Sequence, residues 1–239
     1  MTTCTLTLLR RDTVAEGTTA FHFAKPRGFD FVAGQYVDMS LIAPREQDPA
    51  GNLRSFSIAS APGDDELVFA TRMRATPFKR ELAALPEGSA VSIAGPSGDL
   101  VLDDDPRPVV LVAGGIGITP FRSMLRDAAH RASGRDITLI YGNRTPQACA
   151  FMTELDGLRA RLAGLRVVHC MSEPEQAQPP WTGERGFITE KLLARHVADA
   201  SEPVFYVVGP PAMTAAMRDT LMNFGVDEEA VRVEEFAGY

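Results

Sequence analysis

The stretch from Val109 to Leu125 reads VVLVAGGIGITPFRSML, and it decides the fold of the second half of the chain. A run of aliphatic residues ends at the paired glycines Gly114 and Gly115, and an amphipathic stretch begins after Gly117. Glycine lets a backbone turn sharply and approach a ligand, because no Cβ stands in the way. The segment therefore predicts a buried strand, a glycine turn and the start of a helix, in that order.

The start of this helix is a candidate anion site. Thr119 is a candidate N-cap, and Pro120 fits the first helical position. Free N–H groups at a helix N-terminus bind phosphate, so a nucleotide or dinucleotide is the first ligand to consider. The glycine spacing departs from G-x-G-x-x-G, and the alternative is a turn that serves packing alone.

The composition suits a globular chain with one large or two small domains. The chain has 239 residues, of which 45% are hydrophobic, and a net charge of −7. Because it is acidic and has no basic stripe, we expect no nucleic-acid partner. The N-terminus shows no signal-peptide pattern, and the longest apolar run, Val109 to Ile118, is too short to span a bilayer. The expectation is a soluble cytoplasmic protein without membrane insertion.

Cysteine and histidine spacing predicts no metal site. The three cysteines are far apart and form no C-x-x-C pair, and the four histidines lack metal-ligand spacing. A fused iron–sulfur domain needs a larger cysteine set than this chain provides. We expect reduced, mostly buried thiols.

The first half reads as short strands with period-two alternation, separated by Gly, Pro and Asp. This pattern is typical of a small antiparallel barrel or sandwich. One helical segment, Pro77 to Leu85, interrupts it. The predicted strands are Thr3–Arg10, Thr18–Ala24, Tyr36–Leu41, Arg54–Ala59, Glu66–Met73 and Ala90–Ala94.

From about Arg107 strands and helices alternate, which predicts a parallel sheet with helices on both faces. The charged, proline-containing segment Asp103 to Pro108 separates the halves, so we predict domains at residues 1–103 and 107–239. The predicted strands are Val109–Ala113, Asp136–Tyr141, Arg166–Met171 and Val204–Val208. The predicted helices are Pro120–Ala132, Thr145–Leu162, Thr189–Val197 and Pro211–Phe224.

The strand that begins RSFS at Arg54 carries candidate ligand groups. An arginine pairs with phosphate in a bidentate way, and Phe56 lies two residues on, on the same face. Serine hydroxyls bond ring carbonyls or nitrogens, but strict alternation puts Ser57 on the opposite face. The alternative is an ordinary barrel strand with one surface arginine.

Seven short segments follow one another along the chain: GQY from Gly34, RSFS from Arg54, GPSG from Gly95, GGIGITP from Gly114, YGNR from Tyr141, YVVGPPAM from Tyr206 and EEFAGY from Glu234. Their order resembles the ferredoxin–NADP(+) reductase superfamily of flavoenzymes, over essentially the whole chain. The resemblance implies a FAD-binding barrel followed by an NAD(P)-binding α/β domain.

The resemblance implies that Arg54 holds the flavin phosphate, that Phe56 lines the isoalloxazine–ribityl side and that Ser57 lies near the reactive ring nitrogen. At the second flavin segment many relatives carry Gly-x-x-Ser, whereas this chain has Thr76-Pro77-Phe78-Lys79. Lys79 then supplies charge, and the departure leaves FMN as the alternative to FAD. The implied flavin-binding residues are Tyr36, Arg54, Ser55, Phe56, Ser57, Thr71, Arg72, Met73, Thr76 and Lys79.

The resemblance also implies a nicotinamide site, with NADH or NADPH as co-substrate. The glycine turn would bind pyrophosphate, and Val208 stands where some members carry a cysteine beside the nicotinamide. Glu173 would repel a 2′-phosphate and favours NADH, although Arg144 would offset this. The implied residues are Gly114, Gly115, Gly117, Ile118, Thr119, Pro120, Arg144, Ser172, Glu173, Gly209, Pro210, Pro211 and Met213.

The C-terminal segment resembles the family's terminal acid and aromatic, which cover the flavin face. Glu234 and Phe236 fit that pattern, and Tyr239 is either an extension or the stacking ring itself. The implied catalytic residues are Ser57, Glu234 and Phe236, and Phe236 and Tyr239 are also implied cofactor contacts. The alternative is a frayed terminus.

The resemblance implies hydride transfer from a nicotinamide to the flavin, and then single electrons to a separate acceptor. The basic cluster Arg72, Arg74, Lys79 and Arg80 predicts docking of a small acidic redox carrier, such as a ferredoxin, a flavodoxin or an oxygenase component. The alternatives are a reductase of free flavin, ferric chelates or quinones, a non-catalytic FAD-holding electron-transfer subunit, and a nucleotide-binding regulator. The acceptor, the direction of electron flow and the oligomeric state are left open by the sequence.

Overall fold

The computed structural model describes residues 2–46 and 48–236, and these fall into two compact units. One unit holds the chain up to Leu102 together with Thr119–Asp127. The other holds Asp103–Ile118 and the chain from Ala128 onward. Because Thr119–Asp127 groups with the first unit, the domain limits 1–103 and 107–239 stay a prediction.

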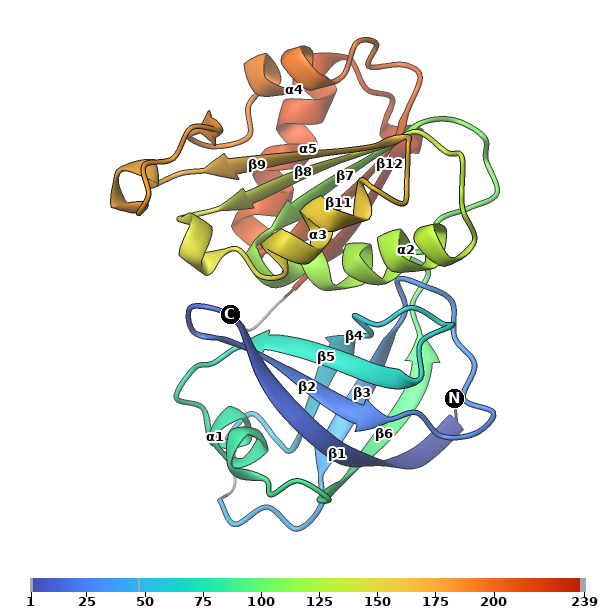
Figure 1. The fold of residues 1–239 in the computed structure, drawn as a ribbon, viewed down its shortest axis with the longest axis vertical. Helices are drawn as coiled ribbons and strands as arrows, with labels where there is room; N and C mark the ends of the chain where they lie inside the picture. The colour runs from blue at the N-terminus through green and yellow to red at the C-terminus, as the bar shows by residue number, and fades with distance from the viewer. Residues whose placement is uncertain (1, 47, 237–239) are drawn as a thin grey trace. The chain divides into compact units, whose positions relative to one another are not determined.

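The first unit is built on a six-stranded antiparallel sheet with the order β4-β3-β6-β1-β2-β5 (Figure 1). The predicted antiparallel class is confirmed, and the strand ends differ from the predicted ones by a few residues. The elements are β1 (Thr2–Ala15), β2 (Thr18–Ala24), β3 (Tyr36–Leu41), β4 (Leu53–Ser57), β5 (Glu66–Arg72), α1 (Pro77–Ala84) and β6 (Ala90–Ser97).

Residues just after β4 bring the two edge strands of this sheet together. The backbone N–H of Ala59 donates to the carbonyl of Val68 on β5 at 2.8 Å, and the N–H of Val68 donates to the Ser60 hydroxyl at 3.1 Å. The interior holds aliphatic residues and phenylalanines such as Phe21 and Phe69, so the pleat alternation read from the sequence does separate core from surface. The sheet therefore curls into a barrel around one apolar core.

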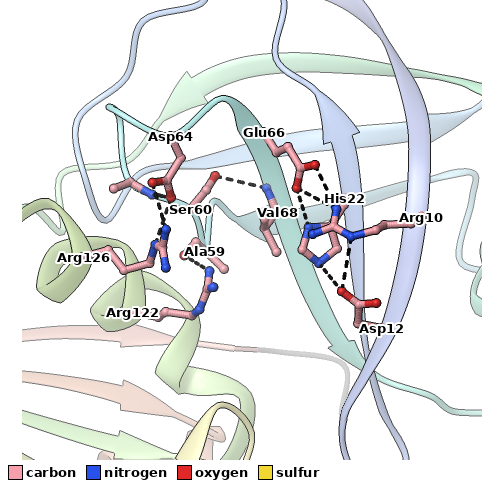
Figure 2. A network of polar contacts seen from close by, with 11 residues as sticks. Arg10, Asp12, His22, Ala59, Ser60, Asp64, Glu66, Val68, Arg122 and Arg126 are labelled. Carbon is pink, nitrogen blue, oxygen red and sulfur yellow. Dashed lines mark hydrogen bonds and ion pairs between the residues drawn. The ribbon is translucent and has the colours of Figure 1, made fainter. Parts of the chain in front are cut away.

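Two polar networks brace this unit (Figure 2). The imidazole of His22 lies between two carboxylates, with Nδ1 2.8 Å from Glu66 and Nε2 3.0 Å from Asp12. On helix α2 (Ile118–His130), the guanidinium of Arg122 donates to the Ala59 carbonyl at 2.7 Å, and Arg126 pairs with Asp64 at 2.9 Å. These contacts hold α2 against the loop between β4 and β5, which follows the RSFS motif.

The second unit is built on a six-stranded parallel sheet with the order β10-β9-β8-β7-β11-β12. This confirms the predicted parallel α/β class, and the buried strands are the aliphatic runs seen in the sequence. The strands are β7 (Val109–Gly114), β8 (Ile137–Asn143), β9 (Leu165–Met171), β10 (Glu184–Arg185), β11 (Val204–Gly209) and β12 (Val231–Glu235).

Helices cover both faces of the parallel sheet. Helices α4 (Glu190–His196) and α5 (Pro211–Phe224) pack on one face, and α3 (Met152–Leu158) lies on the other (Figure 1). A short 3-10 turn, η1 (Gly115–Gly117), joins β7 to α2. Three more such turns are η2 (Pro146–Ala148), η3 (Pro174–Gln176) and η4 (Glu228–Ala230).

Two of the predicted helical features are wrong. Thr119 is not an N-cap, because α2 already begins at Ile118, directly after η1. The predicted helix Thr145–Leu162 is interrupted: Thr145 caps η2, and Phe151 adopts a left-handed conformation (φ 61°) before α3 begins. Strands β10 and β12 carried no clear signal in the sequence.

Candidate functional site

The first candidate site lies where β4 meets the start of α1. The Arg54 side chain turns toward this helix, and its guanidinium lies over the Phe78 ring at 5.2 Å from the ring centroid. Phe78 in turn stacks on Phe56, with 6.1 Å between centroids. The guanidinium is thus held on an aromatic platform, which suits it to present charge to an anion.

A carboxylate already contacts these groups. Asp48 Oδ2 accepts from Arg54 Nη2 at 2.8 Å and from the backbone N–H of Phe78, in the first turn of α1, at 3.1 Å. Hydrogen bonds from the backbone N–H of Ala50 and of Phe78, together with the Arg54 charge, hold the pKa of Asp48 below its usual range. Arg54 and the α1 N-terminus therefore bind an ionised oxyanion in this structure, although it belongs to the chain itself.

Lys79 adds a buried cation to the same place. Its ammonium donates to the Arg72 carbonyl at 2.8 Å, and the residue is only 7% exposed. Burial, followed by the nearby charges of Arg74 and Arg54, lowers the pKa of Lys79 to about 8. Thr76 caps the helix by accepting from the Lys79 N–H at 3.4 Å. The positive charge here exceeds what Asp48 alone neutralises, which suits a phosphate.

One of the four residues in the basic cluster is not available as expected, and docking of a redox carrier on this cluster stays a prediction. Lys79 is buried, so it does not offer its charge to a protein partner. Arg80 is paired with Glu46 at 2.7 Å. Arg74 and Arg80 are exposed, and Arg72 is partly exposed. The burial of Lys79 and the pairing of Arg80 were not visible in the run of basic residues.

The residues of β3 and β4 divide between the two faces of the sheet. Phe56 lies in the barrel core, and the register pairs Tyr36 with Ser57 on the opposite, outer face. The Tyr36 ring also packs over Gly98, where a Cβ would lie 2.9 Å from Tyr36 Cδ1. The predicted separation of Ser57 from Phe56 is therefore observed, and Tyr36 is the aromatic residue beside Ser57.

The remaining predicted flavin-binding residues support this region through packing and hydrogen bonds. The Ser55 hydroxyl donates to Asp38 at 2.5 Å, Thr71 is buried, and Met73 packs against the barrel core. Their contact with a flavin stays a prediction.

The second candidate site lies at the carboxyl edge of the parallel sheet. The chain order reverses between β7 and β11, since β8 and β9 follow on one side of β7 and β11 and β12 lie on the other. In open α/β sheets ligands bind outside the carboxyl ends of the strands at such a switch point. The glycine turn after β7 and the segment Gly209–Met213 after β11 both begin there. The sequence motifs thus meet at the position where the fold favours a ligand.

Glycines let the backbone segments at this edge of the sheet lie unusually close together. A Cβ on Gly117 would fall on the Val208 carbonyl, with its carbon at 2.7 Å and Gly209 Cα at 3.0 Å. A Cβ on Gly114 would fall on the sulfur of Met213, and one on Gly209 would lie 3.0 Å from the same sulfur. Two strands and a turn can approach this closely only because these positions lack side chains.

The other residues predicted at this turn have different exposure. Pro210 and Pro211 are exposed at the start of α5. Gly115 is partly exposed within η1. Ile118, Thr119 and Pro120 are buried in the first turn of α2, so a ligand contact by Thr119 stays a prediction.

The predicted specificity residues are brought together at the ends of β8 and β9. The Ser172 N–H donates to the Asn143 carbonyl at 2.9 Å, and the Glu173 N–H donates to the Arg144 carbonyl at 2.8 Å. Glu173 also accepts from the Gln176 amide at 2.8 Å. Arg144 and Glu173, which were expected to have opposite effects on a 2′-phosphate, are therefore neighbours.

The described part of the C-terminal segment, up to Phe236, continues the sheet. The Phe236 N–H donates to the Gly209 carbonyl at 3.0 Å, directly after β12. Glu234 is half-buried, and burial raises its pKa to about 6. Tyr239 lies outside the described residues.

Two residues at these sites were missed in the sequence. Asp48 lies in an irregular loop with no periodicity to mark it. Phe187, 81% exposed, follows Gly186, whose N–H donates to the Met171 carbonyl at 2.8 Å, next to Ser172. An aromatic residue in a GERGFIT turn was a signal that could have been used.

Comparisons with known proteins support the predictions made for both halves of the chain. Residues 111–219 match the oxidoreductase NAD-binding domain family. The chain is 29% identical, over 91% of its length, to a component of the Na(+)-translocating NADH-quinone reductase of Shewanella denitrificans, and it covers 57% of that component. The chain thus spans about half the length of the curated relatives it matches.

Solved structures resemble the whole chain. A cytochrome P450 reductase from Amycolatopsis matches with a TM-score of 0.83 and 25% identity, over 98% of this chain and 70% of that one. A ferredoxin–NADP+ reductase from Neisseria gonorrhoeae, with bound FAD and NADP, matches with a TM-score of 0.81 and 20% identity, over 98% and 99%. These comparisons confirm the predicted resemblance to the ferredoxin–NADP+ reductase superfamily.

The same comparisons confirm the predicted class of flavin-dependent NAD(P)H oxidoreductase, and the cofactor class of FAD with a nicotinamide nucleotide. The residues present fit these groups. The Arg54 region already holds an oxyanion, and the Gly114–Gly117 turn lies at the switch point of the parallel sheet, where nucleotides bind. Within the described residues no helix is long and apolar enough to cross a bilayer.

Proposed function

We propose that this reductase oxidises NADH with FAD and passes single electrons to a separate carrier. The observation that carries the proposal is the pairing of two built features in one chain, an oxyanion site at Arg54 and α1 and a glycine turn at the β7/β11 switch point. When bound, a nicotinamide supplies hydride, and a flavin accepts two electrons and releases them one at a time. The protein binds and orients both groups and excludes water.

The first unit would hold the flavin. Arg54, Lys79 and the first turn of α1 would bind its phosphate groups. Tyr36 and Ser57, paired on the outer face of β3 and β4, would contact the ring system. FAD is preferred over FMN, in line with the FAD named for the Neisseria reductase.

The second unit would hold the nicotinamide nucleotide. The glycine turn and the Gly209–Met213 segment would bind the pyrophosphate, because both lie at the switch point of the sheet. The exposed ring of Phe187 would support the adenine base. Glu173 favours NADH, since a carboxylate bonds ribose hydroxyls and repels a 2′-phosphate.

A small redox protein, ferredoxin- or flavodoxin-like or part of an oxygenase, is the proposed acceptor. The Amycolatopsis neighbour is a reductase for a cytochrome P450, which is a protein acceptor of this kind. Quinone is a second candidate acceptor, because the curated relatives are components of NADH-quinone reductases. A cytoplasmic location stays a prediction.

An anaerobic titration tests the proposal. The purified protein reconstituted with FAD should show a yellow absorption band that NADH bleaches, while NADPH acts at least about tenfold more slowly if Glu173 excludes the 2′-phosphate. Ferredoxin, flavodoxin and a soluble quinone are then compared as acceptors of the stored electrons. A chain that binds FAD but is bleached by neither nucleotide would be a non-catalytic electron-transfer protein.

The affinity for FAD should depend on pH through Lys79. In the free protein Lys79 has a pKa of about 8, and a bound phosphate favours its charged form, so binding takes up a proton. The Kd for FAD should therefore rise above pH 8, by at most about tenfold per pH unit. Fluorescence titrations from pH 7 to 10 measure this. Lys79→Met should flatten the profile, and an unchanged slope in that variant would assign the titration to another group.

A further inference from the structure

The anion-binding groups of the barrel are occupied by a side chain of the chain itself. Asp48 Oδ2 accepts both from the Arg54 guanidinium at 2.8 Å and from the Phe78 N–H at 3.1 Å. Its other oxygen accepts from the Ala50 N–H at 2.9 Å, and the side chain is only 7% exposed. One carboxylate oxygen thus collects the cation and the helix N–H that an oxygen of a phosphate group would use.

We propose that Asp48 is a specificity-determining residue of the flavin site, whose carboxylate occupies the phosphate position until a phosphate-bearing flavin displaces it. This inference rests on the proposed flavin-binding function. It concerns which flavins the site prefers, and not whether the site binds a flavin. Loading is then an exchange of one anion for another on Arg54 and α1.

The contacts around Arg54 mean that a phosphate must compete with Asp48 for this guanidinium. Arg54 Nη1 is taken up by the carbonyls of Gly51 at 2.8 Å and Leu53 at 2.7 Å, so its Nη2 side, where Asp48 binds, is the side that meets an anion. A second anion beside an ionised carboxylate is repelled. The charged groups around the position are Arg54, Arg74, Lys79 and Asp48, together with Arg80, which is paired with Glu46.

The excess of cations explains why the exchange favours the flavin. Lys79 lies close enough to Arg54 and Arg74 for their charges to disfavour its own protonation. Asp48 brings one negative charge, whereas a flavin phosphate or pyrophosphate brings more. The larger anion therefore gains more from the same cations, and Asp48 reduces that gain without abolishing it.

This predicts a difference between flavins that carry phosphate and riboflavin, which carries none. Replacing the carboxylate by an amide, Asp48→Asn, keeps the shape and one acceptor oxygen, which can still accept from the Ala50 N–H, but removes the competing charge. We expect the Kd for FAD and for FMN to fall about tenfold, because a charge-assisted contact is released to the ligand. The Kd for riboflavin should stay within about twofold.

Flavin fluorescence quenching measures the three dissociation constants in wild-type protein, Asp48→Asn and a matched control. Glu46→Gln is that control, since it removes one negative charge from the same loop but from a carboxylate paired with Arg80. It should leave all three constants nearly unchanged. Asp48→Ser serves as a second variant if the amide does not fold, as judged by circular dichroism.

Other roles for Asp48 would give different patterns in the three dissociation constants. A weaker affinity for FAD and FMN, with riboflavin unchanged, would overturn the inference, because Asp48 would then orient Arg54 for the phosphate. An equal change for all three flavins would also overturn it. Wild-type protein that binds none of the three would contradict the proposed function itself, whatever the variants do.

Discussion

Arg54→Ala should weaken the binding of FAD by about fiftyfold or more. A charge-assisted hydrogen bond contributes about 1.5–3 kcal/mol, and every 1.4 kcal/mol or so changes a dissociation constant about tenfold. Arg54 is held in place by the Phe78 ring and by the Gly51 and Leu53 carbonyls, so little side-chain entropy is lost when it meets a phosphate. Its removal also leaves the Asp48 carboxylate without its cation beside any incoming phosphate.

Fluorescence quenching with FAD and riboflavin measures this loss. Riboflavin should bind wild-type and variant protein alike, because it offers no phosphate to Arg54. Arg45→Ala is the matched control, since it removes an exposed arginine from the loop before β4. A variant that loses riboflavin as strongly as FAD would show that Arg54 supports the fold of the loop, and not the phosphate.

The fold was readable from the sequence where burial imposes a strong pattern. The strand Val109–Gly114 is buried throughout, and such a strand between helices must be aliphatic, so the run VVLVAG marks it. The barrel strands alternate because one face of each lines the core. Helix Pro211–Phe224 was predicted at its observed bounds, since Pro211 opens it and Gly225, with φ 93°, ends it.

Elements that depend on a few backbone contacts were not readable. Strand β10 has only the two residues Glu184 and Arg185, and it exists because they pair with β9. The helix expected from Thr145 is broken at Phe151, whose left-handed backbone no apolar spacing reveals. Local propensity favoured one long helix there, and tertiary packing overrode it.

The residues of the candidate sites likewise divide into those that the sequence predicts and those that it does not. Glycines such as Gly114 and Gly117 were predicted because close backbone approach requires them, and the structure places them at the switch point. The state of the charged groups was not predictable. Lys79 reads as an exposed cation in the sequence, yet its ammonium is buried on a backbone carbonyl. Asp48 reaches Arg54 across an irregular loop, and only the folded chain shows that contact.

Gly117→Ala should destabilise the second unit by about 2–4 kcal/mol, whereas Gly114→Ala should cost less than about 1.5 kcal/mol. The added methyl at Gly117 meets the Val208 carbonyl and Gly209 Cα, which are backbone atoms of the buried strand β11 and cannot move alone. The methyl at Gly114 meets the end of the Met213 side chain, which has other rotamers.

Urea unfolding followed by Trp181 fluorescence measures both variants. Trp181 is the single tryptophan of the chain and lies in the second unit, so its signal follows that unit. Reconstituted Gly114→Ala should remain folded, and any loss of NADH oxidation in it would come from the altered turn. Equal destabilisation by the two substitutions would mean that the η1 turn shifts as a whole, and that the close approach of Gly117 to β11 is not what fixes glycine at this position.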